Sequence, residues 1–321
     1  MYDLFTPAKN PFDRATLNCL SDQHAYDSLL ELAISRLTEA DEIIQRAVAE
    51  EITCHFLVIG RDGSGRTSIA NCLLGRYARL RGIARHRLLV PSESLWPAQE
   101  VLPDAPIKAY RQWLQDLINT MRRTKLRPSQ DLEKELVDLA ASGVAMMPER
   151  IAGALYDVAA HLGSQQEPAG LALKIERVPN AEYASMSRKA FSGVRAMCVM
   201  TTSEYSELGG QVMRDRPKEF DYVDMVIHLG NLTGGDAYRI LEAIWKTSCS
   251  ADFPFPRAPI VAWQDGKLDS IKRILRVMKS ELDLRLARAR RAAKGGAVTA
   301  ESLIPDEAEL AEELAALSSV W

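Results

Sequence analysis

The sequence has few cysteines, little net charge and no long apolar run, and each shortage excludes a class of protein. Its five cysteines are scattered and never form a CxxC pair. Neither a disulfide framework nor a zinc site is therefore expected, and a reducing cytoplasm fits. The net charge of −3 gives no overall attraction to nucleic acid or to a membrane surface. No apolar run approaches the roughly 18 residues that a membrane span needs, and the first residues lack the basic-then-apolar order of a signal peptide. We therefore expect a cytoplasmic protein that does not enter a membrane.

A glycine-rich turn lies between an apolar run and an amphipathic pattern in the segment from Cys54 to Leu74, CHFLVIGRDGSGRTSIANCLL. The spacing is that of the phosphate-binding loop, G-x-x-x-x-G-K-[ST], with Arg66 at the lysine position. In such a loop, glycines let several N–H groups turn inward and the N-terminus of the following helix faces the phosphates. The residues expected to bind phosphate are Gly60, Asp62, Gly63, Ser64, Gly65, Arg66, Thr67 and Ser68.

Two side chains of this loop have separate expected roles. Thr67 would supply a hydroxyl to Mg²⁺, and Arg66 would reach the outer phosphates of a nucleotide. Arginine is always cationic and binds phosphate oxygens in bidentate fashion. Its planar head is bulkier than an ammonium, so we expect nucleotide binding without efficient phosphoryl transfer. The alternative is a strand-to-helix turn with no ligand, although the three glycines Gly60, Gly63 and Gly65 exceed what a simple turn needs.

Apolar runs alternate with longer amphipathic segments along the chain. Strands are expected at 56–59, 85–90, 170–175, 194–200 and 223–229. Helices are expected at 22–51, 69–80, 105–121, 131–142, 148–163, 181–192, 233–245 and 268–293. This order predicts an α/β fold, a parallel sheet with helices on both faces and a small helical lid after it. Together with the phosphate-binding loop after the first strand, it predicts a three-layer P-loop NTPase.

The same patterns suggest four parts of the chain. Their expected bounds are an N-terminal arm at 1–21, a nucleotide-binding α/β domain at 22–231, a helical lid at 232–294 and an acidic C-terminal tail at 295–321. The arm contains three aromatic residues, Tyr2, Phe5 and Phe12. Such an arm can pack against its own domain or against a neighbouring subunit, and the sequence does not choose between them.

The order of these parts resembles the AAA+ ATPases and the related signal-transduction NTPases. The branch concerned includes origin-recognition, transposition-regulator and bacterial defence ATPases. The features that carry the resemblance are the loop GRDGSGRT, the strand LALKIE at the Walker B place, the strand VRAMCVMTTSE at the sensor-1 place, a late strand VIHLGNL and a helical lid that begins at Thr233. The resemblance covers roughly residues 22–292. Only the loop is a specific motif, since the other features are matched by their position.

The resemblance implies a role for the carboxylate that follows the LALKI strand. In the family, this strand ends in an Asp for Mg²⁺ and an adjacent Glu that polarises the attacking water. Here Glu176 is followed by Arg177, so the Walker B motif is degenerate. Glu176 is the candidate metal ligand or base, whereas the charge of Arg177 would oppose Mg²⁺. The alternative is that Glu176 is a surface carboxylate at a strand end.

The resemblance also implies candidates for contact with the γ-phosphate. Thr202, or its neighbour Thr201, matches the sensor-1 place, where a polar side chain orients the water. Arg214 and Arg216 lie about where family members keep an arginine finger that reaches a neighbour's nucleotide. A strand-end threonine and a solvated pair of arginines are the alternatives. Lys272 or Arg273 is the sensor-2 candidate in the lid.

These features predict a regulatory or scaffold subunit that binds ATP or ADP with Mg²⁺ and hydrolyses it weakly or not at all. The expected partners are copies of itself, an effector protein, or both. One alternative is an active AAA+ ATPase, a switch or motor on DNA or on a partner protein, in a bacterial antiviral defence or transposition-type system. Another is a non-catalytic interaction module with a ligand-free loop. Basic clusters lie at 76–87, 122–127 and 285–294, but the net charge does not favour nucleic acid.

Overall fold

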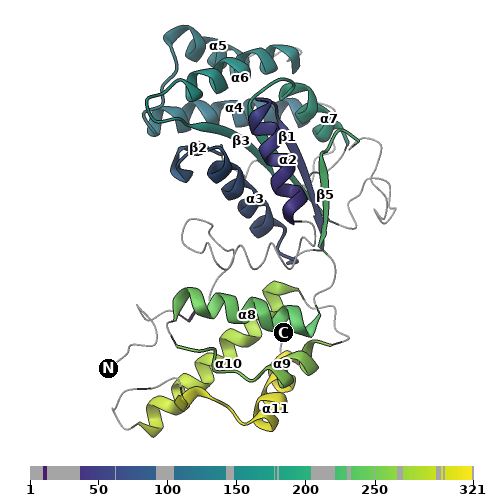
Figure 1. Ribbon diagram of the computed structural model, residues 1–321, viewed down its shortest axis with the longest axis vertical. Coiled ribbons are helices and arrows are strands. Elements are labelled where there is room, and N and C mark those ends of the chain that lie inside the picture. The colour runs from purple at the N-terminus through teal and green to yellow at the C-terminus, as the bar shows by residue number, and fades with distance from the viewer. Residues whose placement is uncertain are drawn as a thin grey trace. The chain divides into compact units, whose positions relative to one another are not determined.

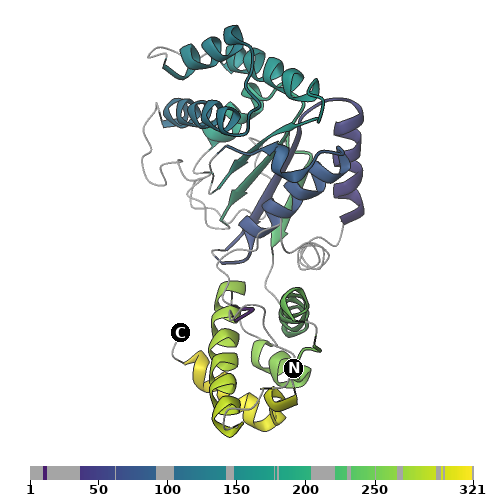
Figure 2. The ribbon, with the colours of Figure 1, turned by 90° about the vertical axis from the view of Figure 1, so that its left-hand side faces the viewer.

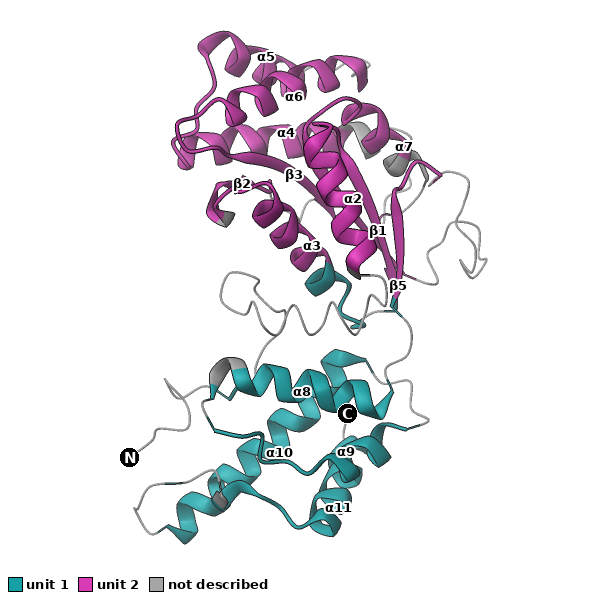
Figure 3. Ribbon diagram, viewed as in Figure 1, with its two compact units in different colours: residues 1–35, 61–69, 229–321 teal, residues 36–60, 70–228 magenta. Residues whose placement is uncertain are grey.

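The chain divides into two compact units. The computed structural model (Figure 1) describes residues 10–12, 37–61, 63–91, 105–141, 148–176, 178, 181–203, 221–229, 233–249, 251–265, 270–293, 298 and 301–319. One unit, the sheet unit, comprises Arg36–Gly60 and Ala70–His228 (Figure 3). The other, the helical unit, comprises Met1–Ser35, Arg61–Ile69 and Leu229–Trp321. Each unit has its own packed core and is described by itself.

A five-stranded sheet in the order β2-β3-β4-β1-β5 forms the centre of the described part of the sheet unit. The strands are β1 (Cys54–Gly60), β2 (Leu88–Leu89), β3 (Gly170–Ile175), β4 (Ala196–Thr202) and β5 (Met225–Leu229). β1 pairs with β4, β4 with β3 and β3 with β2, each time in parallel. In register, Ile59 lies opposite Thr202, and Ile175 lies opposite Met200. The carboxyl ends of β1, β3 and β4 therefore lie at one edge of the sheet.

Helices cover both faces of this sheet (Figure 2). On one face lie α4 (Ala105–Arg123), α5 (Gln130–Ala141), α6 (Pro148–Gly163) and α7 (Ala181–Ala190). Their apolar side chains form one core with alternate strand residues such as Leu57, Leu173 and Cys198. The other face is covered by α2 (Leu37–Ala49) and α3 (Arg66–Leu80). Every residue of β1, β3 and β4 is buried, as expected of parallel strands covered on both faces. The expected α/β P-loop NTPase fold is confirmed.

Local differences from the expected elements are few. The strand expected at 85–90 is a 3-10 turn, η1 (Arg85–Arg87), followed by the two residues of β2. The helix expected at 22–51 is described only as α2, and the rest of it lies outside the described residues. The strand at 170–175 and the helix at 148–163 have the expected bounds.

The C-terminal part of the helical unit opens with a helix that has a capping box. Thr233 caps α8 (Gly234–Ser248): its hydroxyl accepts from the Asp236 N–H, and the Asp236 carboxylate accepts from the Thr233 N–H, both at 3.1 Å. The later helices are α9 (Arg257–Gln264), α10 (Ile271–Ala292) and α11 (Glu307–Ser318), with a 3-10 turn η3 (Glu301–Leu303) between the last two. The segment expected to be an acidic tail thus contains α11, whose Leu310 and Leu314 are buried.

The described part of the N-terminal arm packs on its own chain. Phe12 is 2% exposed, and its ring centroid lies 6.5 Å from that of Trp245 and 6.4 Å from that of Phe253. The Asn10 side-chain amide donates to the Lys279 carbonyl oxygen at 2.9 Å. Pro11 and Phe12 are therefore buried in the helical unit, and the partly buried Asn10 is hydrogen-bonded to α10. Among the described residues, no helix has the length and apolar character that crossing a membrane requires.

Candidate nucleotide-binding site

The glycine-rich loop has the backbone that its sequence requires. β1 ends at Gly60 and α3 begins at Arg66. Between them, Gly63 has φ +80° and Gly65 has φ +94°, in the left-handed region that only glycine enters without strain. The Ser64 N–H donates to the Arg61 carbonyl oxygen at 3.0 Å, which closes the turn. Asp62, another predicted member of the loop, lies outside the described residues.

The loop presents features that suit an anion. The first N–H groups of α3 have no acceptor within the helix, and the positive end of the helix dipole lies there. The first turn of α3 contains no acidic residue. Arg66 is only 7% exposed. The Ser64 hydroxyl is buried and has no hydrogen-bond partner among the described residues. Since buried polar atoms are normally paired, a phosphate oxygen would satisfy this hydroxyl.

The N-terminus of α10, which belongs to the same helical unit as the loop, lies against it. The Lys272 N–H donates to the Gly63 carbonyl oxygen at 3.4 Å. A Cβ atom added to Gly63 would lie 2.8 Å from the Cβ of Ser270. The Arg273 guanidinium instead donates to the Ser318 carbonyl oxygen of α11 at 2.9 Å. Of the two sensor-2 candidates, it is therefore the backbone of Lys272 that contacts the loop, while Arg273 holds α11.

At the carboxyl edge of the sheet, the end of β4 holds the segment that follows β3. The Val178 N–H donates to the Thr201 carbonyl oxygen at 2.8 Å. The Thr202 hydroxyl donates to the Val178 carbonyl oxygen at 3.5 Å. Thr202 thus has a hydrogen-bond acceptor within the protein. The other predicted residues of the catalytic group, Arg214 and Arg216, lie outside the described residues, as does Arg177.

A buried lysine that the sequence analysis did not single out binds Glu176. Lys174 of β3 is 1% exposed. Its ammonium donates to the Asn71 side-chain oxygen of α3 at 2.8 Å and lies 3.2 Å from Oε1 of Glu176. The contact with Glu176 is an ion pair without hydrogen-bond geometry. The sequence did contain a signal for this ion pair. Lys174 interrupts an otherwise apolar strand, and a buried cation needs a counter-charge nearby.

The residues proposed for Mg²⁺ do not fit a metal held by the protein. Glu176 is engaged by Lys174, so a metal ion would have to compete with a buried ammonium for it. Thr67, half-buried in the first turn of α3, offers one hydroxyl. No group of three or more His, Cys, Asp and Glu side chains in the described part of the chain could hold a metal ion. Mg²⁺ normally requires at least one available carboxylate besides the phosphates.

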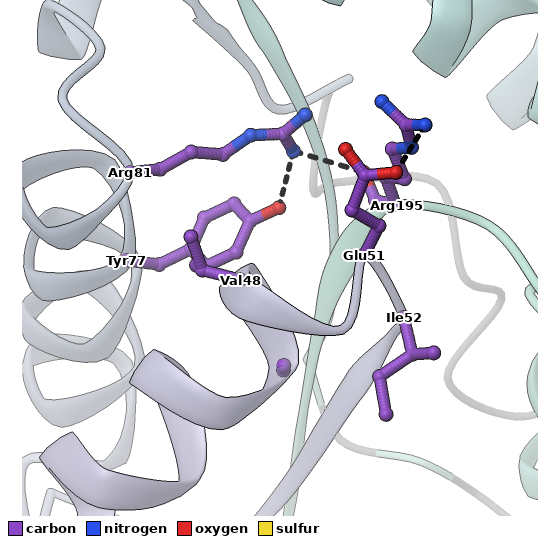
Figure 4. Close-up of a pocket in the computed structure, with 7 residues that line it drawn as sticks. Val48, Glu51, Ile52, Tyr77, Arg81 and Arg195 are labelled. Atoms are coloured by element: carbon purple, nitrogen blue, oxygen red, sulfur yellow. Dashed lines mark hydrogen bonds and ion pairs between the residues drawn. The ribbon is translucent and has the colours of Figure 1, made fainter.

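A separate pocket of about 190 Å³ lies between α2, α3 and the start of β4 in the sheet unit (Figure 4). Arg81 donates to the Tyr77 hydroxyl at 2.6 Å and to the Arg195 carbonyl oxygen at 3.0 Å. Glu51 forms an ion pair with Arg195. Glu51 precedes β1 and Arg195 precedes β4, so this pocket lies at the amino ends of the strands. It is therefore at the opposite edge of the sheet from Gly60, and its charged groups have partners within the pocket.

The chain is similar in fold to solved structures of known proteins. Neither a protein-family model nor a curated protein matches the sequence. Among solved structures, the chain is similar to the ORC2 protein of Aeropyrum pernix in its ADPNP–ADP complexes, with 14% identity, a TM-score of 0.53, and coverage of 98% of this chain and 72% of that one. The ADP form of the same protein has 13% identity, a TM-score of 0.50, and coverage of 97% and 73%. The fold is that of an α/β P-loop NTPase. Identities of 13% and 14% mean that this similarity concerns the fold alone.

Proposed function

We propose that this chain binds ATP or ADP at the loop 60–68 and acts as a regulatory or scaffold subunit. The observation that carries the proposal is the loop itself. Two left-handed glycines lead into the N-terminus of α3, and the buried Arg66 lies in its first turn. The ORC2 structures of similar fold contain ADPNP and ADP, which supports a nucleotide as the ligand.

Three observations support weak or absent hydrolysis. Arginine stands where the loop motif has lysine, and its planar head is less suited to assist phosphoryl transfer. Glu176, the candidate base, is paired with Lys174, and a general base must be able to reach the proton it removes. The Thr202 hydroxyl already has an acceptor within the protein, the Val178 carbonyl oxygen at 3.5 Å. The nucleotide would then act as a bound ligand that controls assembly.

The proposed partners are further copies of this chain, an effector protein, or both. Arg214 and Arg216 are the candidates for contact with a neighbour's nucleotide. We place the protein in the cytoplasm, and a role in bacterial antiviral defence rests on analogy of fold alone. DNA is not the favoured partner, because the net charge of −3 gives no general attraction to it.

Nucleotide binding and turnover can be measured on the full chain. We expect millimolar ATP or ADP to raise the melting temperature, because a ligand that binds only the folded state stabilises it. Phosphate release should stay at background. A melt that neither nucleotide moves would favour a ligand-free interaction module. Mg²⁺-dependent hydrolysis that Glu176→Gln abolishes would instead favour an active ATPase.

A further inference from the structure

Lys174 lies inside the sheet, on the face that α3 covers. In the register of the strands it is opposite Val199 of β4, which in turn is opposite Phe56 of β1. Its neighbours Leu173 and Ile175 point into the core on the other face. Because side chains alternate along a strand, Lys174 and Glu176 share one face. The lysine approaches the carboxylate from the interior of the protein.

The position of Lys174 makes Glu176 a fixed counter-charge. The Lys174 side chain is fully buried, whereas that of Glu176 is 28% exposed. A buried ammonium is strongly disfavoured unless it is paired and hydrogen-bonded. Asn71 supplies a neutral acceptor at 2.8 Å, and Glu176 supplies the negative charge at 3.2 Å. Removing one partner of such a pair leaves an uncompensated buried charge. The buried Lys174 therefore already neutralises Glu176, whose exposed side is the one that a ligand could reach.

This inference rests on the proposed nucleotide site. We propose that Lys174 takes the place of a divalent cation at Glu176, so that this chain binds ATP without Mg²⁺. Glu176 follows β3 at the sheet edge where β1 delivers the phosphate-binding loop. An unpaired carboxylate there would repel a triphosphate unless a metal ion neutralised it. Lys174 supplies this neutralisation permanently. A metal ion that took Glu176 would leave the buried ammonium without its counter-charge.

Titration of a fluorescent ATP analogue into the full chain tests the proposal. One series contains excess MgCl₂ and the other contains EDTA. We expect the two dissociation constants to agree within about twofold, as no carboxylate–metal contact is lost. Binding in MgCl₂ that weakens about tenfold or more in EDTA would overturn the proposed role of Lys174 while leaving nucleotide binding intact. No binding in either series would overturn the proposed function, and this inference with it.

A variant makes the role of Lys174 specific. Lys174→Met keeps an unbranched apolar chain but frees Glu176, so ATP affinity should become about tenfold or more weaker in EDTA than in MgCl₂. The matched control is Lys246→Met, which removes a lysine paired with Glu242 at 2.8 Å on the exposed surface of α8. The control should stay as insensitive to Mg²⁺ as the unmodified chain. A folded Lys174→Met protein that is equally insensitive would contradict the proposal, and a thermal melt establishes that it is folded.

Discussion

Asn71 on α3 accepts a hydrogen bond of 2.8 Å from the buried ammonium of Lys174 on β3. The helix that follows the phosphate-binding loop is thereby tied to the strand that ends beside Glu176. Both residues belong to the sheet unit. Because the bond involves a charged donor in the interior, it is one of the stronger polar contacts in this unit.

Asn71→Ala should lower the free energy of unfolding of the sheet unit by about 1–3 kcal/mol, since hydrogen bonds to buried charged groups contribute that much. Denaturant unfolding measures the change. The matched control is Asn119→Ala on α4, where the side-chain oxygen accepts only a 3.4 Å bond from the neutral amide of Gln115. That substitution should cost less than about 0.5 kcal/mol. Equal losses in both variants would mean that the contact with Lys174 adds nothing.

Arg66→Ala should weaken ATP binding about tenfold or more, because it removes the buried cation in the first turn of α3. Arg79→Ala, an exposed arginine on the same helix, is the control and should bind normally. Titration of a fluorescent ATP analogue gives both values. Arg66→Lys restores the lysine of the loop motif but leaves Glu176 paired with Lys174, so phosphate release should stay at background. Brisk hydrolysis by Arg66→Lys would show that the arginine alone blocks turnover.

Gly65→Ala should abolish nucleotide binding by distorting the loop. At φ +94° an alanine is strained by on the order of 1–2 kcal/mol, and its Cβ would lie 2.9 Å from the Cδ1 of Ile271. The control is Gly153→Ala within α6, where an added Cβ has no neighbour within 4 Å. It should stabilise the fold by about 0.5–1 kcal/mol. Normal binding by a folded Gly65→Ala protein would be evidence against the loop geometry described above.

Stability of the helical unit should depend on pH through Glu281 of α10. Burial raises the pKa of this carboxyl to about 7 from 4.5, aided by its hydrogen bond with Glu313, while Arg285 acts to lower it. The folded state therefore holds more protons than the unfolded state between about pH 4.5 and pH 7, and stability from this group falls as the pH rises through that window. Well above pH 7, the stability that protonated Glu281 contributes is lost completely.

Glu281→Gln should remove this fall, because an amide does not titrate. The pKa of Glu313, despite partial burial, is lowered by its hydrogen bonds with Glu281 and Arg288, which acts in the opposite direction. The informative quantity is therefore the difference in unfolding free energy between the unmodified chain and the variant, followed from about pH 5 to pH 7.5. Glu312→Gln on the exposed side of α11 is the control. A difference that stays constant across the window would rule out titration of Glu281.

Phe12→Ala should destabilise the helical unit by about 3 kcal/mol, because it empties a buried position between Trp245 and Phe253. Denaturant unfolding measures this loss. Tyr156→Ala on α6, where the side chain is 51% exposed, should change stability by less than about 0.5 kcal/mol. An undiminished free energy of unfolding in Phe12→Ala would mean that residues 10–12 contribute little to the core.

The sequence by itself determined the loop and the class of fold. Gly63 and Gly65 impose their backbone locally, and the spacing to Thr67 is a property of consecutive residues. The apolar runs of β1 and β4 required a sheet covered on both faces. The start of α8 at Thr233 was also predicted correctly, because the capping box that Thr233 forms with Asp236 involves residues of one helical turn.

Only the tertiary structure decided what these residues touch. Asn71 and Lys174 come together because α3 packs on β3, and no local pattern encodes that contact. Strand alternation puts Lys174 and Glu176 on one face, but only the packing of α3 buries the ammonium beside the carboxylate. The sequence predicted an acidic tail at 295–321. This segment contains α11, which buries Leu310 and Leu314 within the helical unit. Its weak amphipathic pattern could not reveal a partner distant in sequence. Burial depends on which elements pack together, so the fold decided that Glu176 lies beside a buried ammonium.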